Sequence, residues 1–187
     1  MNTHFDLNGS QLKDYGLDLI DVDWLKQLKK ETLARLKTQS IPSKKDEEWR
    51  YTNIEPLIQK CFDLAAKNSI SNLKKDKSFI QKHSDNNIFI YYADGHFCFM
   101  GNLPSYIKTL RTSEDQMIFQ TLLNYDVEKI HTPFADLNTL MLSDVLMIET
   151  LKNQKIDATI HIIICSDVEQ NISPRLLVQL RENSSIR

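Results

Sequence analysis

Two pairs of metal-ligating side chains stand at a spacing that would place them on one face of a β-strand. His96 and Cys98 are two positions apart, and His161 and Cys165 are four positions apart. Alternate residues of a strand point to the same side, so each pair could present an imidazole and a thiolate together. Zinc or iron accepts such ligands. A small thiol- or metal-binding enzyme built from these four residues is therefore one hypothesis.

The same spacing also fits ordinary core residues, because even-numbered separations in a strand always share a face. A tetrahedral metal site needs further ligands, and none is close to either pair in sequence. The remaining cysteine, Cys61, is distant from the other two, and the three cysteines form no Cys-x-x-Cys pair. Isolated thiols in apolar sequence are usually buried. We expect the cysteines to be core residues and this chain to hold no metal or cofactor.

The elements that must position these residues are a hairpin and a later strand. Residues 88–92 and 96–100 are β-prone runs that flank Ala93-Asp94-Gly95, and Asp-Gly predicts a hairpin because its turn needs positive φ angles. Residues 160–165 are apolar apart from His161, which is typical of a strand covered on both faces. The hairpin is the most strongly indicated β feature.

Helical periodicity is clear before the hairpin. Residues 24–36 carry apolar side chains at three- and four-residue spacing, and the lysines lie largely off that stripe. Asp21 or Asp23 is the predicted cap, and Pro42 is the predicted stop. A shorter apolar stripe runs over residues 54–62.

Two further helix starts follow the hairpin. Ser113 with Gln116 forms a capping-box pattern, and Thr132-Pro133 places a capping hydroxyl before a first-turn proline. Asn138 interrupts the apolar segment of the second helix. Its amide would need partners if buried, so we expect it to bridge backbone groups.

Between the first helix and the hairpin, residues 42–57 concentrate aromatic and charged side chains. Trp49 and Tyr51 flank Arg50, whose guanidinium can pair with a carboxylate or stack on a ring. We expect this stretch to be a structural joint, buried where the helices meet the β-structure. The joint comprises Glu47, Trp49, Arg50, Tyr51 and Thr52.

The last third of the chain has the composition of successive strands. Residues 145–148, 158–165 and 175–180 are β-prone and are separated by polar turns. The sequence stops just after the last of these runs, which predicts an unpaired edge strand. We expect the chain to be part of something longer, and to self-associate through that edge.

The composition narrows the classes of partner. The 187 residues include 23 basic and 25 acidic side chains, so the balance gives no reason to expect nucleic acid or an anionic membrane as partner. Apolar runs are far shorter than the roughly 20 residues that span a bilayer, and the amino terminus lacks the apolar core of a secretion signal. The default location is the cytoplasm.

Five stretches resemble, in order, the SufD family of the SUF iron-sulfur cluster assembly system. The most specific is Glu47-Glu48-Trp49-Arg50-Tyr51-Thr52, which is similar to the family's Glu-x-Trp-(Arg/Lys)-Tyr-Thr signature. Family members commonly have a glycine after the aspartate that follows the Leu-Asn segment, whereas Val145 follows Asp144 here. The other four stretches are residues 89–96, 134–139, 158–167 and 173–178.

The resemblance implies an α+β fold in which an amino-terminal helical region with a β-hairpin precedes the first strands of a right-handed parallel β-helix. We divide the chain accordingly into four parts. These are an amino-terminal arm and helices with the joint (1–63), a polar linker (64–86), the hairpin and helices (87–143), and the start of the β-helix (144–187).

The resemblance also implies a function. It is that of a non-enzymatic SufD-like scaffold subunit, which works in a complex with SufB and the ATPase SufC and meets an iron-sulfur cluster only in that assembly. The family's regions for pairing with SufB and gripping SufC have no counterpart in this chain. Two other hypotheses stay open, namely the thiol or metal enzyme and a free-standing adaptor whose lysine-bearing helix binds a partner protein.

Overall fold

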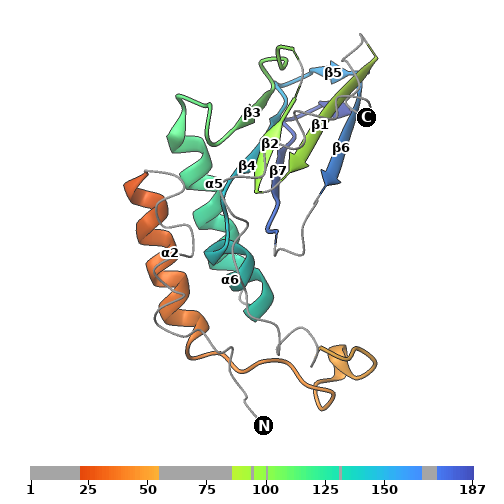
Figure 1. Ribbon diagram of the computed structural model, residues 1–187. Coiled ribbons are helices and arrows are strands. Elements are labelled where there is room, and N and C mark those ends of the chain that lie inside the picture. Colours follow the sequence, from red (N-terminus) through yellow and green to blue (C-terminus); the bar gives the residue numbers. More distant parts are fainter. Residues whose placement is uncertain (1–21, 55–85, 94, 100, 131, 166–171) are drawn as a thin grey trace.

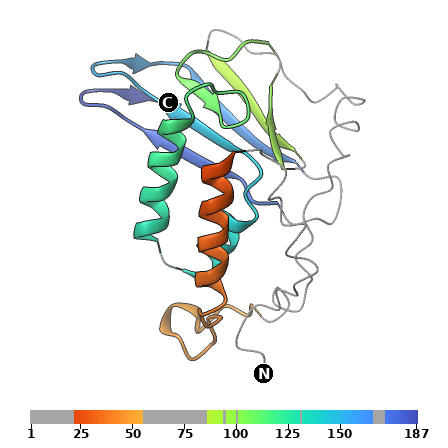
Figure 2. The same ribbon diagram turned by 90° about the vertical axis from the view of Figure 1, so that its left-hand side faces the viewer.

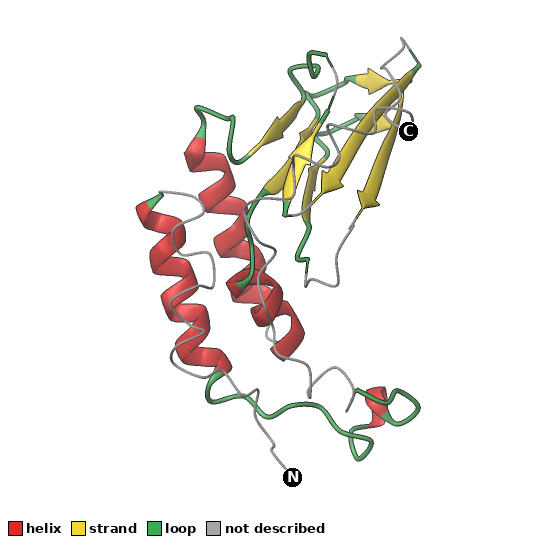
Figure 3. Cartoon of the chain, viewed as in Figure 1, coloured by secondary structure: helices red, strands yellow, loops and turns green. Residues whose placement is uncertain are grey.

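The computed structural model describes residues 22–54, 86–93, 95–99, 101–130, 132–165 and 172–187. Helices gather at one end of the molecule and strands at the other (Figure 1), and the separation is plain when the chain is coloured by secondary structure (Figure 3). The predicted α+β class is therefore confirmed. The helical elements are α2 (Asp23–Leu36), the 3-10 turn η1 (Glu47–Trp49), α5 (Gln116–Lys129) and α6 (Pro133–Leu140).

The strands form small sheets. The first has the order β2-β1-β6, the second has the order β3-β4-β7, and β5 pairs with β8. Among the residues that the structure describes, every helix is too short or too polar to cross a lipid bilayer. The strands are β1 (Asn87–Ala93), β2 (His96–Cys98), β3 (Ile107–Thr109), β4 (Val145–Glu149), β5 (Lys155–Ile156), β6 (Thr159–Cys165), β7 (Arg175–Gln179) and β8 (Ser185–Ile186).

The helix starts were predicted with mixed success. Thr132 caps α6 as expected, because its Oγ1 accepts a hydrogen bond from the Ala135 amide at 3.2 Å. The capping prediction for α2 is wrong, since Val22 occupies the N-cap and no side chain caps the helix. α5 begins at Gln116 and not at Ser113, and the side-chain Nε2 of Gln116 donates to the Ser113 carbonyl at 2.8 Å.

The predicted hairpin is confirmed. β1 and β2 pair antiparallel, and Gly95 has the positive φ of 89° that such a turn needs. The predicted late strands also form, as β4, β6 and β7. The short strands β3, β5 and β8 were not predicted.

Parallel pairing joins the late strands to one another. Val145 pairs with Arg175 and Lys155 pairs with Ser185, so both ladders join residues 30 positions apart. The turns between the strands repeat at the same interval, since Asn153 and Asn183 both have a positive φ, of 63° and 55°. Asparagine tolerates this left-handed conformation better than most residues. Residues 145–156 and 175–186 are therefore two copies of one stacked unit.

Three apolar clusters hold these parts together. One packs α2 and α5 against β4 and β7, and a second joins α2, α6 and the segments around Ile41 and Ile54. The third lies between the two larger sheets and includes Ile90, Tyr92 and Leu146. α2 and α5 lie side by side (Figure 2), and both contribute side chains to the first cluster.

Candidate functional site at the helix–sheet junction

The predicted joint is attached to the helices through one residue. Trp49 ends the turn η1 and packs on Phe134 of α6, with ring centroids 5.1 Å apart. It borders the apolar cluster that includes Leu36 and Met141. The bulk of the indole therefore anchors the loop, as large aromatic side chains commonly do.

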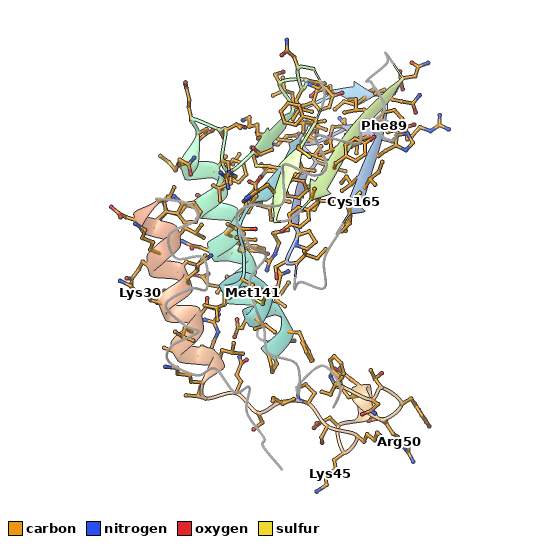
Figure 4. The ribbon with its side chains drawn as sticks, in the orientation of Figure 1. Lys30, Lys45, Arg50, Phe89, Met141 and Cys165 are labelled. Carbon is orange, nitrogen blue, oxygen red and sulfur yellow. The ribbon has the colours of Figure 1, made fainter. Side chains whose placement is uncertain are left out.

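The rest of the joint is not buried, so that expectation was wrong. Tyr51 is 92% exposed, and Glu47, Arg50 and Thr52 are also exposed. The Arg50 guanidinium lies over the Tyr51 ring, 5.7 Å from its centroid, and does not reach the strands. Figure 4 shows Lys45 and Arg50 on a loop that projects away from the rest of the molecule. Within the described part of the chain, the joint presents its polar side chains to solvent.

A partly buried ion pair fastens α2 to α6. Arg35 donates from Nε and Nη2 to the two carboxylate oxygens of Asp136, at 2.8 and 2.6 Å, and Gln39 donates to the same carboxylate at 2.8 Å. Asp136 is 1% exposed, so these donors replace the water that its charge has lost. The bidentate geometry also fixes the rotation of α2 against α6.

A second polar contact from α2 lies deeper in the protein than the Arg35–Asp136 pair. Lys29 is 1% exposed, and its Nζ donates to the backbone carbonyl of Leu142, which follows α6. Burial lowers the pKa of Lys29 to about 8, because an ammonium ion loses hydration in the core. Lys29 therefore links the first described helix to the start of the strand region.

The residues that receive this link form a polar hub, which we define as Leu142, Ser143 and Asp144. Ser143 Oγ donates to the Gly95 carbonyl in the hairpin turn, which leaves its lone pairs to accept from the Tyr92 hydroxyl at 3.3 Å. The hub is buried throughout. It therefore holds the hairpin at the point where the chain passes from α6 into β4.

Asp144 completes the hub. Its Oδ2 accepts from the Phe97 amide at 3.0 Å and its Oδ1 accepts from the Val145 amide at 2.9 Å, so one carboxylate joins β2 to β4. Burial raises its pKa to about 6, although these amides and the charge of Arg111 act in the opposite direction. A buried carboxylate bonded this way is a structural fastener between elements.

The four candidate metal ligands do share one sheet. His96 pairs with Ala93, and Ala93 pairs with Cys165, so a histidine and a cysteine lie in one row with alanine between them. Directly paired residues point to the same side of a sheet. The sequence correctly predicted that His96 and Cys98 share a face, and that His161 and Cys165 share a face. In the sheet, both pairs lie on the same face. Phe89 and Cys165 mark this sheet in Figure 4.

Their contacts are those of structural side chains. Arg111 Nη1 donates to the His96 ring, 3.0 Å from Nδ1, and burial together with the charge of Arg111 lowers the His96 pKa to about 4. His161 stacks on Phe89 at 4.6 Å and bonds Asn87 at 2.8 Å.

Among the described residues, no three His, Cys, Asp or Glu side chains gather closely enough to hold a metal ion. Cys98 and Cys165 are outside any disulfide and of intermediate burial, so neither is the fully buried core residue that was expected. Cys61 lies outside the described residues.

A clamp joins α6 to the first residue of β7. Arg175 donates to Asn138 Oδ1 from Nε at 2.9 Å and from Nη2 at 2.7 Å, and to Thr139 Oγ1 at 3.0 Å. Asn138 Nδ2 donates in turn to the Pro174 carbonyl at 3.4 Å, which confirms that its amide bridges to the backbone. A pocket of about 260 Å³ beside the clamp is lined by Val127, Ile130 and Ala135 as well as by the clamp residues.

The junction was largely missed by sequence reasoning, and Lys29 shows why. It falls on the buried side of α2, three residues before the buried Thr32, but its charge argued for exposure. Asp144 was noticed only as a departure from a family turn. Its position inside the apolar run from Leu140 to Ile148 was the signal of a buried carboxylate.

The arrangement defines an α+β protein whose polar side chains fasten elements together, with two stacked parallel ladders at its carboxyl-terminal end. Residues 13–96 match the family described as the SufBD protein N-terminal region. This part of the chain is therefore similar to the amino-terminal region of SufB and SufD proteins. No curated protein matches the chain. The matched range contains α2, the joint and β1, and it ends at His96, the first residue of β2.

Proposed function

We propose that this chain is a SufD-like scaffold subunit, without enzymatic activity, that takes part in iron-sulfur cluster assembly together with SufB and the ATPase SufC. The observation that carries the proposal is the family match over residues 13–96. The side chains at the junction fit this role, because they tie elements of the fold together.

The stacked units support the finer fold assignment within this proposal. Two strand–turn–strand units, 145–156 and 175–186, stack in parallel at a constant separation of 30 residues. Parallel stacking of successive units is the construction of a β-helix. We accordingly infer that residues 144–187 are the beginning of a right-handed parallel β-helix, in a protein of the cytoplasm.

The test is replacement in a working complex. The corresponding region of a full-length SufD is exchanged for residues 1–187 of this chain, and the chimaera is produced with SufB and SufC in cells that lack SufD. We expect recovery of iron-sulfur enzyme activity. A chimaera that is soluble and still binds SufB and SufC, yet restores no activity, would contradict the proposal.

The isolated chain supplies a second arm of the test. We expect it to hydrolyse no ATP and to bind no SufC, and reconstitution with iron and sulfide should leave no stable cluster. A stoichiometric coloured cluster that is lost in the Cys98→Ser or Cys165→Ser variant would favour the metal-binding hypothesis instead.

A further inference from the structure

The joint belongs to a loop that projects from the molecule but has a fixed shape (Figure 4). Asp46 Oδ2 accepts hydrogen bonds from the backbone amide and the hydroxyl of Ser43, at 2.7 and 3.2 Å. The Trp49 amide donates to the Asp46 carbonyl at 2.9 Å, and its indole packs on Phe134. A segment that is already ordered loses less conformational entropy when it binds a partner. This projecting loop, residues 43–52, is therefore suited to recognition.

The projecting loop presents a cation stacked on an exposed ring. The Arg50 guanidinium lies over the Tyr51 ring, 5.7 Å from its centroid, and Tyr51 is 92% exposed. A guanidinium covers one face of a ring, so the other face of Tyr51 is open. A single exposed aromatic residue is ordinary, but Trp, Tyr and Arg are the residue types that dominate binding energy at protein interfaces. Here Trp49 anchors the loop, while Arg50 and Tyr51 are presented to solvent.

Arg50 has donors to offer. In the part of the chain that the structure describes, no carboxylate forms an ion pair with Arg50, whereas Arg35 and Arg181 each bind one. Glu47 lies three positions before Arg50, but their hydrogen bond joins backbone atoms, from the Arg50 amide to the Glu47 carbonyl at 3.4 Å. A guanidinium carries five N–H donors in a planar fork that fits a carboxylate. Tyr51 steadies this fork and leaves its edge accessible.

The other charges of the projecting loop select the kind of partner. Glu47 and Glu48 are exposed and begin η1, directly before Trp49. A run of phosphates would meet these two acids, whereas a single carboxylate can reach Arg50 without approaching them. The mixture of charges therefore favours a short acidic protein segment over nucleic acid. The exposed cations of the loop are Lys44, Lys45 and Arg50.

We propose that the Arg50–Tyr51 pair is a docking site for a short segment of a partner protein in which a carboxylate lies beside a proline or aliphatic side chain. The carboxylate accepts hydrogen bonds from the Arg50 fork, and the apolar side chain packs on the open face of Tyr51. Covering the ring also strengthens the contact between the guanidinium and the ring, because the pair loses water. The site does not depend on the proposed role in cluster assembly.

The experiment titrates the full chain against a fluorescent peptide, Leu-Pro-Glu-Leu-Pro-Glu-Leu, by anisotropy. We expect saturable binding that weakens as salt is added. The matched peptide with glutamine in place of glutamate should bind at least about tenfold more weakly, because hydrogen bonds to a charged group are the stronger ones. Equal affinity for the two peptides would overturn the proposal, as would absence of saturable binding. Tighter binding of an oligothymidine, lost in Arg50→Ala, would overturn the choice of partner in favour of nucleic acid.

Variants locate the site. Arg50→Ala and Tyr51→Ala should each weaken peptide binding at least about tenfold. Arg50→Lys should also weaken it, because lysine keeps the charge but lacks the planar fork. The matched control is Tyr125→Ala on α5, which removes another exposed ring with a cation over it, Lys129 Nζ at 5.8 Å. We expect the control to bind the peptide normally.

The fold of each variant is checked by its circular dichroism spectrum and its urea midpoint. Tyr51→Ala lies outside the packed clusters, so it should keep both while it loses the peptide. Unchanged affinity in a folded Tyr51→Ala, or an equal loss of affinity in Tyr125→Ala, would overturn the assignment of the site to the projecting loop.

Discussion

Arg175 and Asn138 are 37 positions apart, and two nitrogen atoms of the arginine donate to one oxygen of the asparagine. They belong to two of the stretches that resemble SufD, residues 134–139 and 173–178. The clamp therefore explains why both stretches carry polar residues beside apolar ones. Each supplies half of a contact that seats α6 against the start of the second stacked unit.

Asn138→Ala should lower the free energy of unfolding by about 1–3 kcal/mol, because it removes the oxygen that accepts from two Arg175 nitrogen atoms and the amide that donates to the Pro174 carbonyl. Urea denaturation measures this. Asn102→Ala, at an exposed position, is the control and should stay within about 0.5 kcal/mol of the unaltered protein. Equal effects of the two substitutions would show that the clamp adds nothing to stability.

Two ion pairs of equal N–O distance differ in burial and in the number of hydrogen bonds. The Arg35–Asp136 and Lys152–Glu182 pairs both have an N–O distance of 2.6 Å, but Asp136 is 1% exposed and Glu182 is 66% exposed. Asp136→Asn should cost about 3 kcal/mol, since it removes the charge of a buried carboxylate that three donors hold. Glu182→Gln should cost about 0–1 kcal/mol, and only this small effect should decline with added salt. The free energies of unfolding at low and high salt decide the matter.

The joint contains two aromatic residues, of which one is packed and the other is exposed. Trp49→Ala removes the ring that packs on Phe134 and should destabilise the protein by about 2–3 kcal/mol. Tyr51→Ala removes a side chain that is 92% exposed and should change stability by no more than about 0.5 kcal/mol. Thermal or urea denaturation of both variants tests this. A large loss of stability in Tyr51→Ala would mean that the tyrosine is covered.

Lys29 should make stability depend on pH in the alkaline range. Its pKa is about 8 in the fold against 10.5 ordinarily, so the folded state binds fewer protons between these values. The cost of burying the charge is complete below pH 8 and disappears above pH 10.5, which means that stability rises with pH by up to about 3 kcal/mol. Lys29→Met should remove that rise between pH 7 and pH 10. An unchanged slope in the variant would contradict the assignment.

Asp144 should make stability depend on pH in the acidic range. Here stability should fall as pH rises, the opposite of the effect of Lys29. Its pKa is about 6 in the fold against 3.8 ordinarily, so the folded state binds more protons between these values. Its contribution is most favourable below pH 4 and is lost as pH rises through 6, by up to about 3 kcal/mol. Asp144→Asn should abolish this component when unfolding is followed from pH 4 to pH 7. The Asp157→Asn variant, at an exposed position, serves as the control and should keep the slope.

The sequence predicted those elements whose signals are local. The Asp-Gly turn needs positive backbone angles, and Thr132-Pro133 combines a cap with a first-turn proline, so the hairpin and α6 could be placed from a few residues each. β5 and β8 have two residues apiece, which is too short for any periodicity. The separation of 30 residues between paired positions in both ladders depends on pairing between distant segments. In the sequence it appears only as the recurrence of Leu146 at Leu176, of Asn153 at Asn183 and of Ile156 at Ile186.

The candidate site was predicted less well, for a related reason. Trp49 could be recognised as an anchor from its size alone. Burial of Lys29, Asp136 and Asp144 could not be read from residue type, because a charged side chain is buried only when partners from other elements reach it. Those partners are Leu142, Arg35 and Phe97, none of which is near in sequence.

The contacts of α2 have a consequence for the order in which the protein assembles. Lys29 and Leu142 are 113 positions apart, and Arg35 and Asp136 are 101 apart. Bringing such distant segments together carries a loop-closure cost and slows folding. During synthesis, the segment that forms α2 leaves the ribosome early. The residues on which α2 packs, Asp136 and Leu142, are available only after residue 142 has emerged. The first described helix is therefore among the last to be locked in place.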